Sequence, residues 1–309
     1  MLLLAILIAL FAERLAPQLA ERRSLAWFDA YSELIRTRAS VSGWVALLIL
    51  LAPWAVLAVL AQCLLYGALW GFLELAFGAV VLFFALRPGS VDPAVDAYVA
   101  AREKGEDAQA RHQAEYLLVG SAPGSVEEEV RAVADALLLE ANERWVAPIL
   151  WFVLLGPVGA VVYRLAVHVE ARAGEGALCE AARLLRAAMD FIPAYVLAAM
   201  YTLSGSFEEG LNAWRQRGQV SVDAPHEDEV PAEPKCRAEE LEQANRDVLL
   251  RVGRAALRTE NYSVTTEISD SGDIEADASI VRAARGLVLR TIIIIVAIIA
   301  LMTLGDWIH

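Results

Sequence analysis

Apolar and polar residues occur along this chain in long blocks, and the clearest apolar block is residues 287–304. Its sequence, LVLRTIIIIVAIIALMTL, carries no charge between Arg290 and Asp306 and has no polar face. A helix needs about 20 apolar residues to cross the roughly 30 Å hydrocarbon core of a bilayer. Arg285 precedes the block and Trp307 follows it, where such residues anchor a membrane helix. The pattern predicts a membrane protein.

Further apolar segments extend this pattern and predict an all-α, polytopic helical membrane bundle with helical cytoplasmic loops. They are residues 1–12, 43–62, 67–86, 146–167 and 191–204. The last of these is short and contains a proline, so a tilted crossing and a re-entrant segment are both open. The whole chain, 1–309, is expected to form one membrane domain. Residues 205–285 form a hydrophilic, acidic insertion within it, with one helix predicted at 238–257.

Arginine-rich loops predict the orientation of the bundle. Residues 14–38 and 87–144 flank the pair of crossings at 43–86 and are both rich in arginine, which places them on the cytoplasmic side. Residues 164–186 then fall on the outer side if 146–167 is one full crossing, against the positive-inside trend. The conflict is relieved if their arginines line a polar cavity.

The polar loop before 146–167 is itself helical in pattern. Ser125 followed by Glu128 has the form of a capping box, and it predicts the start of a helix that runs through VRAVADALLLEANERW.

Composition excludes several classes of function. Hydrophobic residues make up 58% of the chain and the formal net charge is −13, so no basic surface for nucleic acid is expected. The three cysteines and four histidines are scattered, which predicts neither a metal site nor a disulfide. No phosphate-binding loop, nucleophile elbow or HExxH motif occurs, and no cofactor is expected.

Polar residues next to the apolar segments are the candidates for a functional site. Glu140, Asn142 and Arg144 precede 146–167, whereas Tyr163 and Arg164, followed by His168 and Glu170, close it. Two interpretations are open: these side chains line a polar pocket between helices, or they are anchors at the headgroups. Glu74 lies either inside the bundle or near an interface. We expect Arg164 to share a cavity with Glu74 or Glu140, because an unpaired charge at that depth is costly.

Three segments in order resemble the AmpE family: Glu115 in AEYLLVG, then APILWFVLLGPVGAVVYRLAVHVE, then Asp190 in MDFIPAYVLAAMY. AmpE proteins are inner-membrane proteins that modulate β-lactamase induction. The resemblance implies a regulatory signalling modulator in the bacterial inner membrane, linked to cell-wall stress, rather than an enzyme. Its implied partners are the lipid bilayer, a cell-wall-derived or other small molecule, and a protein. The polar pocket would comprise Glu74, Glu115, Glu140, Asn142, Arg144, Tyr163, Arg164, Glu170 and Asp190.

The AmpE family is in turn similar to the CobD/CbiB membrane proteins, which form an amide in cobalamin biosynthesis with ATP. Tyr163 and Arg164 match their motif, but Val167 replaces an asparagine and Tyr195 stands where an arginine is usual. An amide ligase of the adenosylcobinamide-phosphate synthase type is therefore the alternative function. A transporter or lipid-handling path through Glu74, Arg164 and Glu170 is a third, and no inverted repeat supports it.

Overall fold

The computed structural model describes the chain in nine ranges, and the regular structure within them is helical, without strands, as the sequence predicts. The described ranges are residues 2–15, 28–33, 42–65, 67, 71–87, 92–174, 176–215, 236–261 and 274–308.

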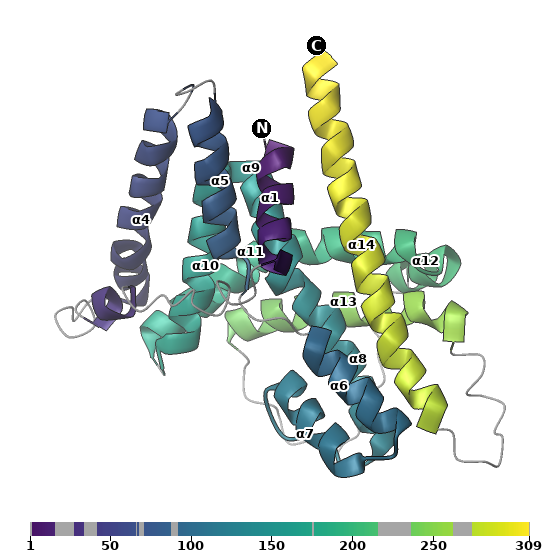
Figure 1. Ribbon diagram of the computed structural model, residues 1–309. Coiled ribbons are helices and arrows are strands. Elements are labelled where there is room, and N and C mark those ends of the chain that lie inside the picture. Colours follow the sequence, from purple (N-terminus) through teal and green to yellow (C-terminus); the bar gives the residue numbers. More distant parts are fainter. Residues whose placement is uncertain are drawn as a thin grey trace.

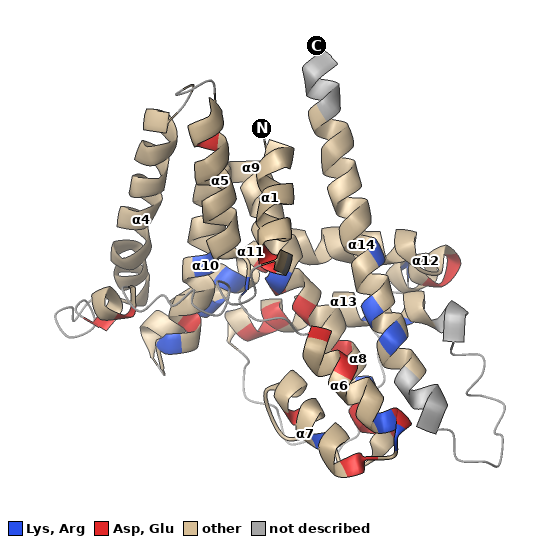
Figure 2. Ribbon diagram, viewed as in Figure 1, with Lys and Arg blue, Asp and Glu red and all other residues tan. Residues whose placement is uncertain are grey.

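Apolar helices form one end of the molecule and charged helices form the other (Figure 1). The apolar end contains α1 (Leu2–Leu15), α4 (Gly43–Leu65), α5 (Phe72–Ala85) and much of α14 (Ile274–Ile308). Figure 2 shows that charged residues are nearly absent there and gather at the opposite end. Long helices without charge are stable in lipid because their backbone groups are satisfied internally. The apolar end is therefore the part of the protein suited to a bilayer.

The charged end is built on α6 (Asp92–Glu103), α7 (Asp107–Leu118) and α8 (Val126–Ala141). The predicted start of α8 is confirmed, because the Ser125 hydroxyl accepts a hydrogen bond from the backbone N–H of Glu128 at 3.2 Å. Arg102 of α6 and Glu129 of α8 form a buried ion pair at 2.5 Å. Burial raises the pKa of the neighbouring Tyr98 phenol to about 12. The ion pair between Arg102 and Glu129 joins α6 to α8 at the charged end.

The apolar segment 146–167, expected to be one helix, is broken at Gly156 into α9 (Ala147–Leu155) and α10 (Pro157–Arg172). Gly156 has a φ of 68°, which side chains rarely tolerate, and Pro157 begins the next helix. A Cβ added at Gly159 would overlap the backbone carbonyl of Trp151 and lie 2.8 Å from Cβ of Leu155. Residues eight apart touch in this way only if the chain folds back, so α9 and α10 form a hairpin.

The hairpin changes the orientation expected from a single crossing. Because α10 returns toward the charged end, Arg186 lies 3.6 Å from Glu143, which precedes the hairpin. Arg172 similarly pairs with Asp29 at 3.0 Å, in the short helical stretch at 28–33. Residues 164–186 were expected on the opposite side from 87–144 only if 146–167 made one full crossing, and the break at Gly156 removes that condition.

Helix α11 (Ala177–Ser204) lies along the boundary between the two ends (Figure 1). Three helices in the described part of the chain are long and apolar enough to cross a membrane, and α11 is one of them with Gly43–Leu65 and Ser279–Thr303. Its first residue contacts Gly43, the first residue of α4. Its last residue, Ser204, lies 2.7 Å from Thr291 of α14, next to the apolar run. Residues 191–204 thus belong to a helix that runs along this boundary, and how they meet a membrane stays a prediction.

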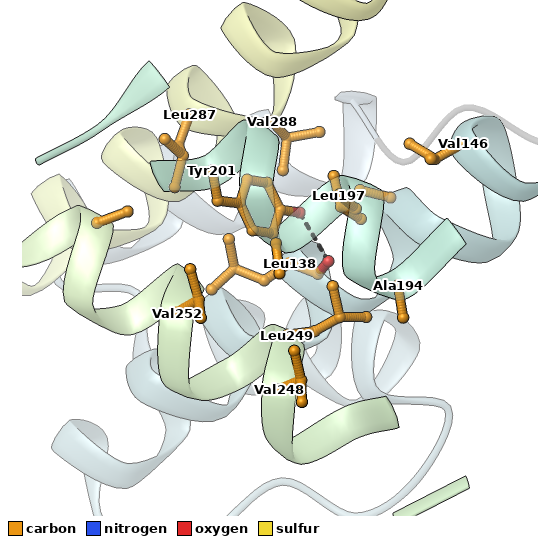
Figure 3. Packing of buried hydrophobic residues seen from close by; sticks show 13 residues of the cluster. Leu138, Val146, Ala194, Leu197, Tyr201, Val248, Leu249, Val252, Leu287 and Val288 are labelled. Carbon is orange, nitrogen blue, oxygen red and sulfur yellow. Dashed lines mark hydrogen bonds between the residues drawn. The ribbon is translucent and has the colours of Figure 1, made fainter. Parts of the chain in front are cut away.

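Two helices follow α11 where the sequence predicts a single helix at 238–257. They are α12 (Phe207–Arg215) and α13 (Arg237–Asn261), and α14 already begins at Ile274. A core of aliphatic side chains joins α8, α11, α13 and α14 around Tyr201 (Figure 3). Tyr201 is fully buried, and its hydroxyl donates to the Leu138 carbonyl at 2.8 Å. The described helix α13 of the acidic insertion is thereby packed against α8, α11 and α14.

The hairpin predicts an asymmetric response to two equivalent substitutions in apolar helices. Gly159→Ala should lower the free energy of unfolding by about 1–3 kcal/mol, because its methyl group overlaps the α9 backbone. Gly286→Ala in α14 should be neutral or stabilising, since its Cβ would only approach the Arg290 side chain at 3.9 Å. Thermal unfolding of both variants in detergent measures the difference. Equal stability of the two variants would show that α9 and α10 do not pack closely.

Candidate functional site

A polar cavity of about 610 Å³ lies at the charged end, beside the boundary. Its walls come from the end of α7, from α8 and the turn after it, and from the facing sides of α11 and α13. Its volume is within the roughly 300–1,000 Å³ range of small-molecule sites. The charged and amide side chains that line it are Arg87, Glu115, Glu140, Asn142, Glu143, Arg144, Arg186, Asp190, Glu242, Asn245 and Arg246.

A π-helical turn, η2 (Asn142–Val146), supplies three polar residues of the cavity. The backbone N–H of Ala147 donates to the Asn142 carbonyl, five residues back, where an α-helix would use four. Pro148 explains the widening, because proline has no N–H to donate to residue 144 and its ring crowds that carbonyl. Such turns occur often at functional sites. Here the turn carries Asn142, Glu143 and Arg144 into the wall of the cavity.

Asp190 of α11 joins three elements at the floor of the cavity. Its Oδ1 atom accepts hydrogen bonds from Tyr163 Oη of α10 at 2.8 Å and from Asn142 Nδ2 at 3.2 Å. Asp190 is only 9% exposed, and Tyr163 is 1% exposed. A buried carboxylate is costly unless it accepts such bonds. The three side chains therefore hold α10, the π turn and α11 in register.

Arg144 is the one cation of the π turn, and only 3% of its surface is exposed. Its guanidinium lies 3.1 Å from Glu140 and 3.7 Å from Glu13 of α1. It also lies over the Trp145 ring, 5.0 Å from its centroid. This cation connects the first helix of the chain to the wall of the cavity.

Arg186 lies among three carboxylates from three elements. It is 2.5 Å from Glu170 of α10, 3.0 Å from Glu242 of α13 and 3.6 Å from Glu143. Glu143 is also 3.5 Å from Arg87. Burial raises the pKa of Glu170 above its usual range, and the charge of Arg186 opposes the rise. The cluster gives the cavity both charge signs, so it suits a polar ligand that carries donors and acceptors.

Two buried amide oxygens have no hydrogen-bond partner within the described part of the chain. Asn142 donates through Nδ2 to Asp190, and Asn245 donates through Nδ2 to the Ala187 carbonyl at 2.8 Å, which leaves both Oδ1 atoms as unused acceptors. Both side chains are at least nine-tenths buried and both line the cavity. An unsatisfied buried acceptor costs about 1–3 kcal/mol. A ligand that donates hydrogen bonds would remove this cost.

The structure brings together most of the residues named from sequence. Five of them line the cavity: Glu115, Glu140, Asn142, Arg144 and Asp190. Tyr163 and Glu170 reach it indirectly, through Asp190 and Arg186.

Two of the named residues lie elsewhere. Glu74 is in the first turn of α5, and Arg164 lines a separate apolar groove with the other end of α5. The expected cavity shared by Arg164 with Glu74 or Glu140 is not found among the described residues. His168 is likewise directed to Asp29, at 2.5 Å.

Sequence reasoning missed the contributions of Arg186, Glu242 and Asn245. Arg186 precedes Asp190 by four residues, so both share one face of α11, and this spacing was an available signal. Glu242 and Asn245 are likewise three residues apart on α13. Nothing local indicated that α13 would pack along α11. In the described ranges no group of three metal-ligating side chains occurs.

Comparison with models of known protein families identifies the family to which this chain belongs. A family model described as "Regulatory signalling modulator protein AmpE" matches residues 1–221. The chain belongs to the AmpE family. The match covers the hairpin and α11, whereas α13 of this AmpE-family chain, with Glu242 and Asn245, lies beyond it. Comparison with curated proteins and with solved structures gives no match. The family and the long apolar helices together fit a membrane protein with a regulatory signalling role.

Burial predicts unequal effects for two arginines that each pair with a glutamate four residues earlier. Arg144→Gln should lower the free energy of unfolding by about 3–5 kcal/mol, because it leaves Glu13 and Glu140 without their buried cation. Arg131→Gln removes an exposed pair with Glu127 and should cost less than about 1 kcal/mol. Chemical denaturation in detergent measures both. Similar losses in the two variants would contradict the role given to Arg144.

A second pair of substitutions tests the bond to Asp190. Tyr163→Phe should destabilise the protein by about 1.5–3 kcal/mol, because a buried carboxylate loses a donor. Tyr116→Phe is the control, since Tyr116 lines the same cavity but is 67% exposed. Thermal shift measurements compare the two. A neutral Tyr163→Phe variant would argue against Asp190 as the centre of the site.

Proposed function

We propose that this AmpE-family protein is a multi-pass modulator in the bacterial inner membrane that binds a cell-wall-derived small molecule and adjusts β-lactamase induction. The observation that carries the proposal is the polar cavity with its two unused buried acceptors, Asn142 Oδ1 and Asn245 Oδ1. Peptide N–H groups and sugar hydroxyls are the donors of cell-wall fragments, and they suit such acceptors. The family match supports the regulatory part of the proposal.

A ligand in the cavity would contact residues that are bonded to the apolar helices. The cavity walls contain Asp190, which holds the hairpin through Tyr163, and Arg144, which contacts Glu13 of α1. A ligand that contacts these groups changes the relative stability of arrangements of α1, α10 and α11. A signal requires such differential contacts in two states. We further propose that a protein partner reads this change on the cytoplasmic side.

Filling the cavity tests the proposal in cells. A deletion strain complemented with Ala136→Phe should show the altered β-lactamase induction of the deletion, because Ala136 lines the cavity and the ring occupies it. Ala108→Phe, on an exposed position of α7, should complement fully. Membrane levels of both variants are compared by immunoblot. Unaltered induction in the deletion strain, or full complementation by Ala136→Phe, would refute the function.

Binding to purified protein gives an independent measure. Soluble muropeptides from digested cell wall are titrated into the full chain in detergent, with heat as the signal. We expect Ala136→Phe to weaken binding by about tenfold or more, since a close-packed aromatic ring excludes ligand, and Ala108→Phe to leave it unchanged. If muropeptides gave no heat of binding with the wild-type protein, the cell-wall ligand would be ruled out. The role in β-lactamase induction would still be decided by the experiment in cells.

The amide-forming alternative stays a prediction from the Tyr163–Arg164 match. In the structure these two side chains diverge, since Tyr163 bonds Asp190 whereas Arg164 lines the apolar groove. A synthase would restore corrinoid synthesis in a CobD-deficient strain, and the modulator would not.

A further inference from the structure

A second hollow lies at the apolar end, between α4, α5 and α10. It measures about 490 Å³, and apolar side chains line it, including Trp54, Leu57 and Ala61 of α4 and Phe77 and Phe84 of α5. α4 and α5 both pack on α10 more extensively than on each other, so α10 forms the floor of the groove. The groove is distinct from the polar cavity, and no wall residue is common to both.

Among the described residues, Arg164 is the single charged side chain in the lining of this groove. Its Nε atom is buried and has no hydrogen-bond partner, and its guanidinium has no carboxylate within ion-pair distance in the described ranges. Glu143 and Arg87 influence it electrostatically from the neighbouring polar cavity, and their charges oppose each other. A guanidinium without a partner beside hydrocarbon is costly. An anionic group held at the groove would remove that cost.

The position of Arg164 along the groove matches that of a lipid headgroup at one end of its acyl chains. Phe84 and Ala85 of the lining end α5 close to Arg87, whose charge acts on Arg164, whereas Phe77 lies nearer the opposite end of that helix. The charge is therefore at the level where headgroups lie, and the apolar lining extends from there into the hydrocarbon region. Arginine binds phosphate through several N–H groups at once.

We propose that the groove between α4, α5 and α10 binds one anionic phospholipid, with an acyl chain against Trp54 and Phe77 and the phosphate on Arg164. The site would make the protein sensitive to the anionic lipid content of the membrane. It is independent of the cell-wall ligand proposed for the polar cavity.

Lipid retention measured by native mass spectrometry tests this proposal. The full chain in detergent is incubated with phosphatidylglycerol or phosphatidylcholine carrying identical acyl chains. Wild-type protein should retain phosphatidylglycerol preferentially, and Arg164→Gln should retain about tenfold less of it, as expected for loss of a charged hydrogen bond. Arg290→Gln, which removes a charge at the boundary on α14, should behave as wild type. Equal retention by Arg164→Gln and wild type, or an equal loss in Arg290→Gln, would overturn the proposal.

A groove-filling variant tests the acyl chain separately from the headgroup. Ala61→Phe should reduce retention of both lipids while its melting temperature stays near that of the wild type. Soluble glycerol phosphate should not displace bound phosphatidylglycerol. Displacement by glycerol phosphate would show an anion site without a lipid chain and would also overturn the proposal.

Discussion

The close approach of two helix backbones at Gly159 is the constraint on which the rest of the structure depends. Gly156 reverses the chain with a positive φ, and Gly159 then packs against the α9 backbone at Trp151. Larger residues at either position would strain the turn or separate the helices. Because the chain returns, Tyr163 and Glu170 reach the charged end, where α11 and the π turn already lie. A straight helix would have carried both residues to the far side of the apolar region.

The return of α10 places a set of charged side chains beside the boundary. The free-energy cost of burying them is offset because they pair with one another. Asp190 accepts from Tyr163 and Asn142, and Arg186 lies among Glu143, Glu170 and Glu242. These interactions come from segments far apart in the sequence, so they fix the helices relative to one another. In a buried polar network each hydrogen bond or ion pair strengthens the others, so the loss of any one side chain destabilises the whole network. The network and the Arg144–Glu13 pair link α10 and α1 to the wall of the polar cavity.

The polar cavity and the apolar groove differ in the solvent to which each is suited. The polar cavity has amide acceptors and both charge signs, whereas the groove has an apolar lining with one guanidinium. Their closeness follows from α10 itself, which directs Tyr163 toward Asp190 and Arg164 toward α4 and α5. Neighbouring residues of a helix point about 100° apart. One helix therefore borders both the polar cavity and the apolar groove.

Local pattern in the sequence determined the class of the fold and many of the site residues. The run at 287–304 indicates a membrane helix because its side chains suit hydrocarbon and a helix satisfies its own backbone groups. Ser125 with Glu128 specifies the start of α8 through a local hydrogen bond. Glu140, Asn142 and Arg144 were visible as polar residues beside an apolar segment. Only the tertiary structure decided that 146–167 is a hairpin, that α11 lies along the boundary, and that Arg186 and Asn245 complete the cavity. A glycine permits a kink or a full reversal equally well, and packing against Trp151 selects between them.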